Sequence, residues 1–190
     1  KRFQDAPGVE IIEGYGMTEA TCLISVNPPD GEKKIGSVGL PYPYTEIRIL
    51  VCNDNGSIQK ECGVDEVGEV CVYNPGVILN GTYTDDKKNK GLYPDDRFMR
   101  TGDLGRIDKD GYLWLTGRAK DLIIRGGHNI DPSLIEDAMA AHKDVAAVGA
   151  IGQPDPKSGE LPCAYVQLIE GSRTSSEAIA NFANEAIGEQ

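Results

Sequence analysis

The sequence predicts an α+β protein with a β-rich first part, residues 1–117, and a smaller mixed second part, residues 118–190. Two observations support this division. From about residue 28, short runs of β-forming residues are separated by glycine and proline turns, a pattern typical of a barrel or a sandwich. After residue 117, helical and strand patterns alternate instead. With 190 residues, 39% of them hydrophobic, the chain is long enough for one ordinary domain or two small ones.

The first part is expected to begin with a strand and a glycine turn. Residues 9–12 are a short apolar run that stops at Gly14-Tyr15-Gly16, and Thr18-Glu19 then opens a short helix or loop. Three further runs predict strands, at residues 46–50, 69–73 and 112–115.

The second part is expected to contain two helices and two strands. Asp131 can cap a helix that has Pro132 at its first position and runs to about residue 141. Residues 145–151 and 164–169 predict strands, and Thr174 with Glu177 matches a capping box. The helix behind this box has an apolar face that needs a packing partner, made of Ile179, Phe182, Ala183, Ala186 and Ile187.

Composition excludes several classes of partner and site. The net charge of −11 argues against nucleic acid or anionic lipid as the main partner, and no apolar run is long enough to span a membrane. Five cysteines without a CxxC pair, together with only two histidines, make a zinc site improbable and indicate reduced thiols in a cytoplasm. Because the sequence starts with lysine instead of methionine, we expect it to begin inside a longer protein or after processing.

The first chemically informative cluster is the glycine-flanked segment at residues 14–19. Tyr15 offers an aromatic face to a planar base, and the neighbouring glycines let a ligand approach the backbone. Thr18 supplies a hydroxyl for a phosphate oxygen, and Glu19 is a hard oxygen ligand suited to Mg²⁺. Taken alone, the segment is weak evidence for a ligand site, and a structural turn is the favoured interpretation.

Two later clusters add complementary groups. Asp103, as an acceptor-only carboxylate, can take hydrogen bonds from both hydroxyls of a ribose. Arg118 can reach ribose or phosphate, and Gly126-Gly127 can let a thin ligand pass along the backbone. Each has a structural alternative, a turn aspartate in the first case and an exposed hairpin in the second.

The order and spacing of these clusters resemble the adenylate-forming superfamily, which includes acyl-CoA synthetases, peptide-synthetase adenylation domains and firefly luciferase. The resemblance runs from about residue 8 to at least residue 169. The family patterns matched are YGxTE at 15–19, GxVGxP at 36–41, GE…G…GY within 68–83, RTGD at 100–103 and GRxKDxI at 117–123.

The resemblance assigns a nucleotide role to five residues. It implies that Tyr15 stacks on adenine, that Thr18 contacts the α-phosphate, and that Glu19 holds Mg²⁺. It further implies that Asp103 binds the ribose hydroxyls and that Arg118 assists there.

The resemblance also assigns roles in the second part. Lys120 lies where the family has a hinge between its large and small domains. Gly126, Gly127 and His128 lie in the loop that lines the pantetheine tunnel of CoA ligases. The form GGxNIxP at 126–132 looks more like acyl-CoA synthetases than peptide-synthetase domains, and Glu136 on the following helix fits a structural role.

On this resemblance we expect the end of an α/β subdomain, a distorted β-barrel and a small, mobile, incomplete α+β C-terminal domain. The parent enzyme is expected to be an acid–thiol ligase that uses ATP and Mg²⁺ to activate a carboxylic acid, fatty or otherwise, as acyl-AMP and transfers it to CoA. The family's lysine-containing phosphate loop and its PKTxxGK lysine do not occur in the 190 residues, so we expect this fragment to be inactive alone.

Three alternatives stay open. The intact protein can hand its acyl-adenylate to a carrier protein in place of CoA. The segment can be a non-catalytic nucleotide-binding or interaction module. It can also be an isolated fragment with no activity of its own.

Overall fold

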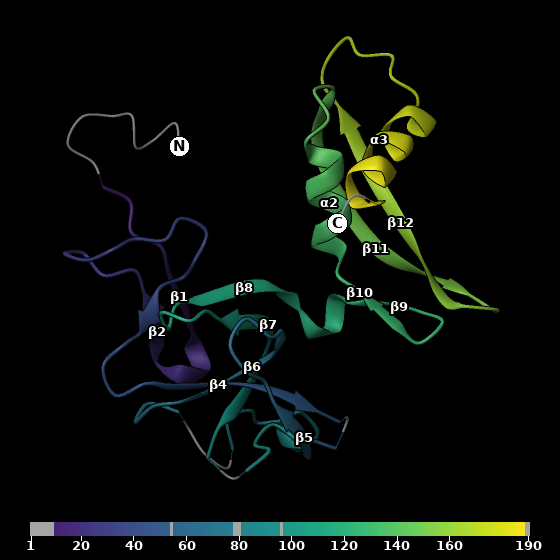
Figure 1. Cartoon of the computed structure of the whole chain (residues 1–190). Coiled ribbons are helices and arrows are strands. Elements are labelled where there is room, and N and C mark those ends of the chain that lie inside the picture. Colours follow the sequence, from purple (N-terminus) through teal and green to yellow (C-terminus); the bar gives the residue numbers. More distant parts are fainter. Residues whose placement is uncertain (1–9, 54, 78–80, 96, 189–190) are drawn as a thin grey trace. The chain divides into compact units, whose positions relative to one another are not determined.

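The computed structural model describes residues 10–53, 55–77, 81–95 and 97–188, and the chain divides into two compact units, residues 1–116 and 117–190. Mixed helices and strands confirm the α+β fold class (Figure 1). The first unit contains β1 Gly14–Met17, the 3₁₀ helix η1 Thr18–Ala20, β2 Cys22–Val26, β3 Leu40–Pro41, β4 Glu46–Cys52, β5 Ile58–Glu61, β6 Gly68–Tyr73, α1 Asp86–Asn89, β7 Met99–Ile107 and most of β8 Leu113–Arg118.

A five-stranded antiparallel sheet forms the centre of the first unit, in the order β5-β4-β6-β7-β8. Its middle strand, β6, is buried on both faces, which explains why its sequence does not alternate between polar and apolar residues. Val70 and Val72 belong to the main core cluster with Ile49, whereas Cys71 packs on the other face with Leu50.

The expected barrel is not closed, and this prediction is corrected by the strand order. Among the described residues, β1, β2 and β3 form a separate three-stranded sheet, which touches β8 through one bridge between Gly39 and Leu113. The edge strand β5 has no buried residue. The sheet therefore ends at β5 as an exposed edge strand.

The start of the chain also differs from the prediction, because the glycines lie in a strand and not in a turn. Gly14–Met17 pairs antiparallel with β2, while residues 10–13 belong to no strand and Val9 lies outside the described residues. Gly16 is required by close approach: a Cβ added there would lie 1.8 Å from the carbonyl oxygen of Cys22.

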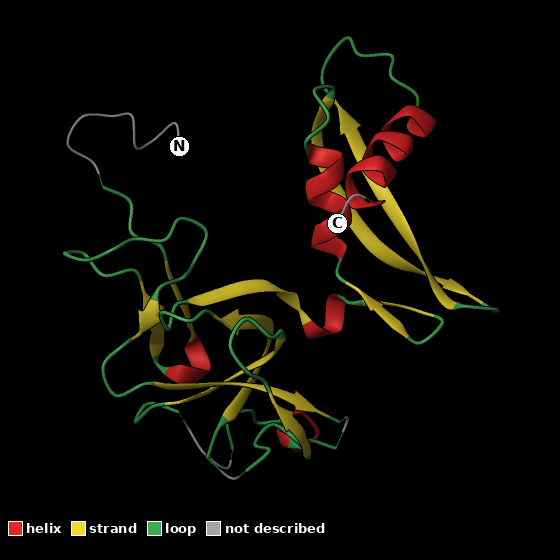
Figure 2. Ribbon diagram, viewed as in Figure 1, coloured by secondary structure: helices red, strands yellow, loops and turns green. Residues whose placement is uncertain are grey.

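The second unit is an α+β layer. It contains the 3₁₀ helix η2 Ala119–Asp121, β9 Ile123–Arg125, β10 His128–Ile130, α2 Pro132–Ala140, β11 Val145–Asp155, β12 Gly159–Leu168 and α3 Ser176–Gly188, with the sheet order β10-β9-β12-β11. Helix α2 packs on β11, and α3 packs beside α2 (Figure 2). The predicted cap of α2 is confirmed, since the Asp131 carboxylate accepts from the amide of Ser133 at 2.9 Å with Pro132 in the first turn.

The predicted capping box of α3 is wrong by one residue. The hydroxyl of Ser175 accepts from the amide of Ala178 at 3.2 Å, and Thr174 instead donates its hydroxyl to Asp144 at 2.6 Å. The apolar face of α3 has found its partner: Ile179 is buried, and the ring of Phe182 meets that of His142 edge-on at 5.0 Å.

Strands β11 and β12 are longer than predicted. The Asp155 carboxylate accepts from the amides of Lys157 and Ser158, at 3.1 and 2.7 Å, and closes a tight turn. From Ala147 onward, pairing therefore continues without a register shift up to the turn.

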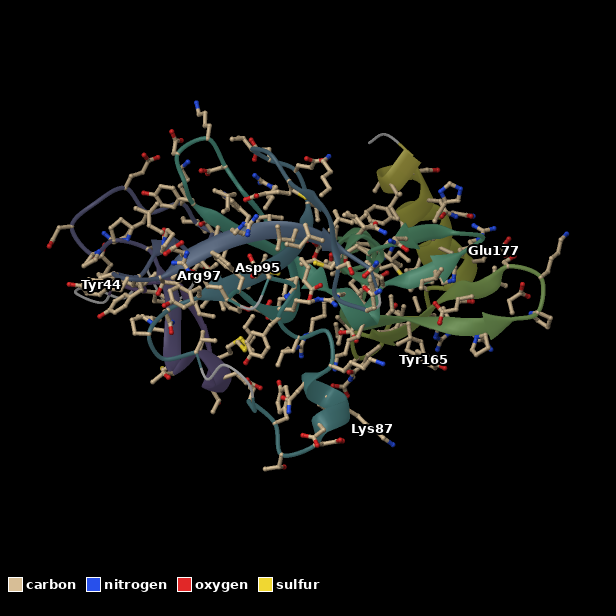
Figure 3. The ribbon with its side chains drawn as sticks, turned by 90° about the horizontal axis from the view of Figure 1, so that it is seen from below. Tyr44, Lys87, Asp95, Arg97, Tyr165 and Glu177 are labelled. Atoms are coloured by element: carbon tan, nitrogen blue, oxygen red, sulfur yellow. The ribbon has the colours of Figure 1, made fainter. Side chains whose placement is uncertain are left out.

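Charged side chains cover the exposed side of the β4 region. Asp95 and Arg97, both labelled in Figure 3, follow α1 and approach this strand. Arg48 pairs with Asp95 at 2.8 Å, and Arg97 pairs with Glu46. None of the helices in the described part of the chain is long and apolar enough to cross a membrane.

Candidate functional site

The first unit brings two predicted nucleotide residues into direct contact. The hydroxyl of Tyr15 on β1 donates to Oδ2 of Asp103 on β7 at 2.5 Å, although the two residues are 88 positions apart. Both side chains are half-buried. A hydrogen bond to an ionised acceptor of this length is of the strong, charge-assisted kind, and it fixes the tyrosine ring relative to the carboxylate.

A β-bulge presents Asp103 to the tyrosine. In the pairing of β6 with β7, Glu69 faces Leu104 and Cys71 faces Arg100, so that residues 101–103 face one residue of β6. Gly102 has φ of 76°, which glycine adopts without strain. The hydroxyl of Thr101 donates to the Val70 carbonyl at 2.8 Å and accepts from the amide of Asp103 at 3.1 Å. The side chain of Thr101 therefore ties the bulge to the main chain of β6 and to the main chain of Asp103.

A buried ion pair supports the same bulge, and the sequence alone did not indicate its role. Glu69, with its side chain 8% exposed, binds Arg100 at 2.7 Å and accepts from the amide of Gly102 at 3.2 Å. Burial disfavours the charged guanidinium, yet the hydrogen bond that Arg100 donates to Glu69, together with the attraction of the Glu69 charge, outweighs this effect and raises the pKa of Arg100. Glu69 thus links the core strand β6 to the turn that carries Asp103.

Helix η1, which carries Thr18 and Glu19, directly follows β1 and its Tyr15 in the sequence. Thr18 is exposed and Glu19 is half-buried. The hydroxyl of Tyr83 donates to Oε1 of Glu19 at 2.7 Å. The C-terminal end of η1 is held by a side chain, because Nδ2 of Asn74 donates to the Ala20 carbonyl at 3.2 Å.

The strand β1 also borders an open, mainly apolar pocket of about 910 Å³. Its lining includes Tyr15, Met17, Thr18 and Leu23. The predicted nucleotide residues Tyr15 and Thr18 thus adjoin an open, mainly apolar pocket.

The donor set at Glu19 agrees with Mg²⁺ more than with a protein-enclosed metal. Within the described ranges, no three His, Cys, Asp or Glu side chains gather where a metal ion could be held. Mg²⁺ is commonly held by one or two carboxylates together with the phosphates of a substrate. A single glutamate beside Thr18, the predicted phosphate contact, fits that mode.

Arg118 and Lys120, the predicted ribose helper and hinge residue, belong to the second unit. Both are exposed, at the end of β8 and within η2, and both line a polar pocket of about 550 Å³. Glu136 lines the same pocket and accepts from the amide of Ala150 at 2.8 Å, in agreement with a structural role.

The Gly126-Gly127 pair forms the two-residue turn between β9 and β10. Arg125 pairs with His128 across it, and the glycine φ angles are 57° and 84°. Positive φ at both central residues is the type I′ hairpin requirement. His128 is exposed at the first position of β10. The turn geometry alone explains both glycines, so a ligand role for residues 126–128 remains a prediction.

Two family models match this chain. The model of the AMP-binding enzyme matches residues 1–80, and that of the AMP-binding enzyme C-terminal domain matches residues 134–190. The chain is 47% identical over 189 residues to the marinolic acid–CoA ligase of Pseudoalteromonas sp.. The matched region covers 100% of this chain and 29% of that enzyme.

Solved structures agree with these matches. ATP-bound MatB from Rhodopseudomonas palustris has a TM-score of 0.83 at 33% identity, covering 94% of this chain and 34% of that one. O-succinylbenzoate coenzyme A synthetase from Bacillus subtilis, in complex with AMP, has a TM-score of 0.76 at 31% identity, covering 97% and 36%. The chain thus spans about a third of the length of these relatives. By its motifs, its fold and both family models, the chain belongs to the AMP-binding, adenylate-forming enzymes and matches their C-terminal region.

Proposed function

We propose that this chain is the C-terminal nucleotide-binding part of an ATP-dependent acyl-CoA ligase. The observation that supports this most is the Tyr15–Asp103 contact, which joins two motif residues from distant strands at 2.5 Å. The names of similar proteins, such as marinolic acid–CoA ligase and long-chain-fatty-acid–CoA ligase, point to a carboxylic acid and CoA as substrates.

The residues of the first unit would bind the adenosine and α-phosphate parts of ATP. The carboxylate of Asp103 has several acceptor sites, so it can accept from Tyr15 and from ribose hydroxyls together. The same contact holds the Tyr15 ring in place as a stacking surface for adenine. The exposed hydroxyl of Thr18 would donate to an α-phosphate oxygen.

Two half-reactions follow for the parent enzyme. A carboxylate oxygen of the acid attacks the α-phosphorus of ATP, and pyrophosphate leaves with the electron pair of the broken P–O bond. The sulfur of CoA then attacks the acyl carbon, AMP leaves, and the thiol proton passes to solvent. Negative charge grows on phosphate oxygens in the first step, and Mg²⁺ held by Glu19 would counter that charge.

The second unit would supply the hinge and the thiol-binding loop. Lys120 would turn the small domain between the two half-reactions, and Gly126, Gly127 and His128 would line the path of the pantetheine arm. Arg118 would assist at the ribose. We also place the protein in the cytoplasm, since all five cysteines are free.

An acceptor assay with the full-length protein tests this proposal. ATP and a panel of carboxylic acids, from short to long chains, would be supplied with CoA, with a phosphopantetheinyl carrier protein, or with neither. We expect pyrophosphate exchange with one class of acid in all arms, and AMP release coupled to thioester only with CoA. Thioester on the carrier alone would contradict the CoA assignment, and binding of ATP without exchange for any acid would indicate a non-catalytic module.

A further inference from the structure

We propose that Tyr83 is a positioning residue for Glu19 that holds one carboxylate oxygen and leaves the other for a cation. The inference rests on the proposed function and extends it to a residue that no family role covers. Its starting point is the 2.7 Å hydrogen bond from the Tyr83 hydroxyl to Oε1 of Glu19, between residues 64 positions apart.

The backbone of Tyr83 is fixed at both of its polar groups. Its amide donates to Oδ1 of Asn89 at 2.9 Å, and its carbonyl accepts from Nδ2 of the same asparagine at 2.7 Å. Asn89 is the last residue of α1, and this helix is capped at its start by Asp85, which accepts from the amide of Lys87 at 3.0 Å. The tyrosine thus projects from an anchored main chain.

The hydroxyl meets a side chain that would otherwise rotate. A glutamate side chain has several rotatable bonds, and ordering it costs conformational entropy. Glu19 lies in a three-residue 3₁₀ helix, which restrains the side chain little. A hydrogen bond from a fixed donor to the ionised acceptor selects one orientation before the cation binds.

The same bond leaves binding capacity on Glu19. A carboxylate has two oxygens and about four acceptor sites, and the Tyr83 bond involves Oε1. Tyr83 would thus be an outer partner that does not touch the metal but orients Glu19, its ligand. Loss of such outer partners typically weakens metal binding by about 10- to 100-fold.

Binding of a paramagnetic substitute tests the inference without turnover. In full-length protein with a non-hydrolysable ATP analogue, free Mn²⁺ is measured by electron paramagnetic resonance. Tyr83→Phe keeps the ring and removes only the hydroxyl, and we expect Mn²⁺ affinity to fall by about tenfold. Tyr112→Phe is the matched control, because the Tyr112 hydroxyl donates to the Glu32 carbonyl at 2.6 Å and not to Glu19. The Mn²⁺ affinity of this variant should stay at the wild-type value.

A double-mutant cycle separates positioning from general stability. If Tyr83 acts through Glu19, Tyr83→Phe should weaken Mn²⁺ binding in the wild-type background and change it less than twofold in a Glu19→Gln background. Equal effects in both backgrounds, or wild-type affinity in Tyr83→Phe, would overturn the inference. Melting of each variant, followed by fluorescence, verifies that the affinity is measured on folded protein.

Failure of the proposed function has a different signature. A wild-type protein that binds the ATP analogue and Mn²⁺ but gives no pyrophosphate exchange would refute the ligase proposal and leave the Tyr83 cycle interpretable. If the wild-type protein is active in exchange and Tyr83→Phe leaves the Mn²⁺ affinity unchanged, only the positioning role is refuted.

Discussion

Removal of Glu69 should destabilise the first unit far more than removal of a second arginine-paired glutamate in the same sheet. Glu69 and Arg100 are 8% and 22% exposed, and Glu69 also accepts from the amide of Gly102. Breaking a buried pair costs about 3–5 kcal/mol because it leaves a charge without its partner. Arg100 keeps partial access to water, so we expect Glu69→Ala to lower the free energy of unfolding by about 2–3 kcal/mol.

Glu61→Ala is the matched control. Glu61 pairs with Arg48 at 2.6 Å, but it is 53% exposed, and Arg48 retains its second partner Asp95. Exposed pairs contribute about 0–1 kcal/mol. Arg48 contacts both carboxylate oxygens of Glu61, whereas both contacts of Arg100 reach Oε2 of Glu69. The two pairs therefore differ in burial and in the bond that Oε1 of Glu69 accepts from the amide of Gly102.

Urea unfolding of the chain, followed by tryptophan fluorescence, measures both variants. The sequence has a single tryptophan, Trp114, which lies in the first unit, so the signal reports that unit specifically. The slope of the transition should match that of wild type in both variants. Losses of free energy within about 0.5 kcal/mol of each other would refute the argument that burial of the pair supports the bulge.

Three further outcomes are expected. In the full-length enzyme, Asp103→Ala should mainly raise KM for ATP, because ribose contacts persist through the reaction, whereas Glu19→Ala should mainly lower kcat of adenylation; steady-state kinetics with varied ATP check this, and the reverse pattern refutes it. Burial disfavours the charged form of Asp108, but hydrogen bonds from Lys34, Trp114 and backbone amides outweigh burial and hold its pKa well below the ordinary value. The resulting stabilisation is present above pH of about 4 and is lost as pH falls below it. Asp108→Asn should therefore lower Tm at pH 7 and narrow the difference in Tm between pH 7 and pH 3; an unchanged difference contradicts the sign. Lys120→Pro should impair one half-reaction much more than the other, measured as pyrophosphate exchange against thioester formation, and equal loss of both would indicate misfolding.

Local signals predicted the elements whose causes are local. The Asp131-Pro132 pair specifies the start of α2, and the β-rich runs specify β4, β6 and β8, because capping and β propensity act within a few residues. At Gly16 the local signal was misleading, since glycine there serves the approach of β2 and not a turn.

The supporting residues of the site were beyond prediction for a physical reason. Glu69 occupies a strand position where an exposed acid is common, and its role depends on Arg100, 31 positions later. Tyr83 lay within a stretch that resembled the family, but its contact with Glu19 joins residues 64 positions apart. Such contacts follow from the folding of the whole unit, and no spacing rule within the sequence encodes them.

The β9–β10 turn has a consequence for how related sequences are compared. A Cβ added at Gly126 or Gly127 would meet no atom within 4 Å, so there is room for a side chain, yet both φ angles are positive. Only glycine, and to a lesser degree asparagine or aspartate, accepts such a backbone cheaply. Identity of these two positions across an alignment would therefore measure the demands of a hairpin. Variation at His128, which has an ordinary strand backbone, would be the better test of the predicted ligand role of the loop.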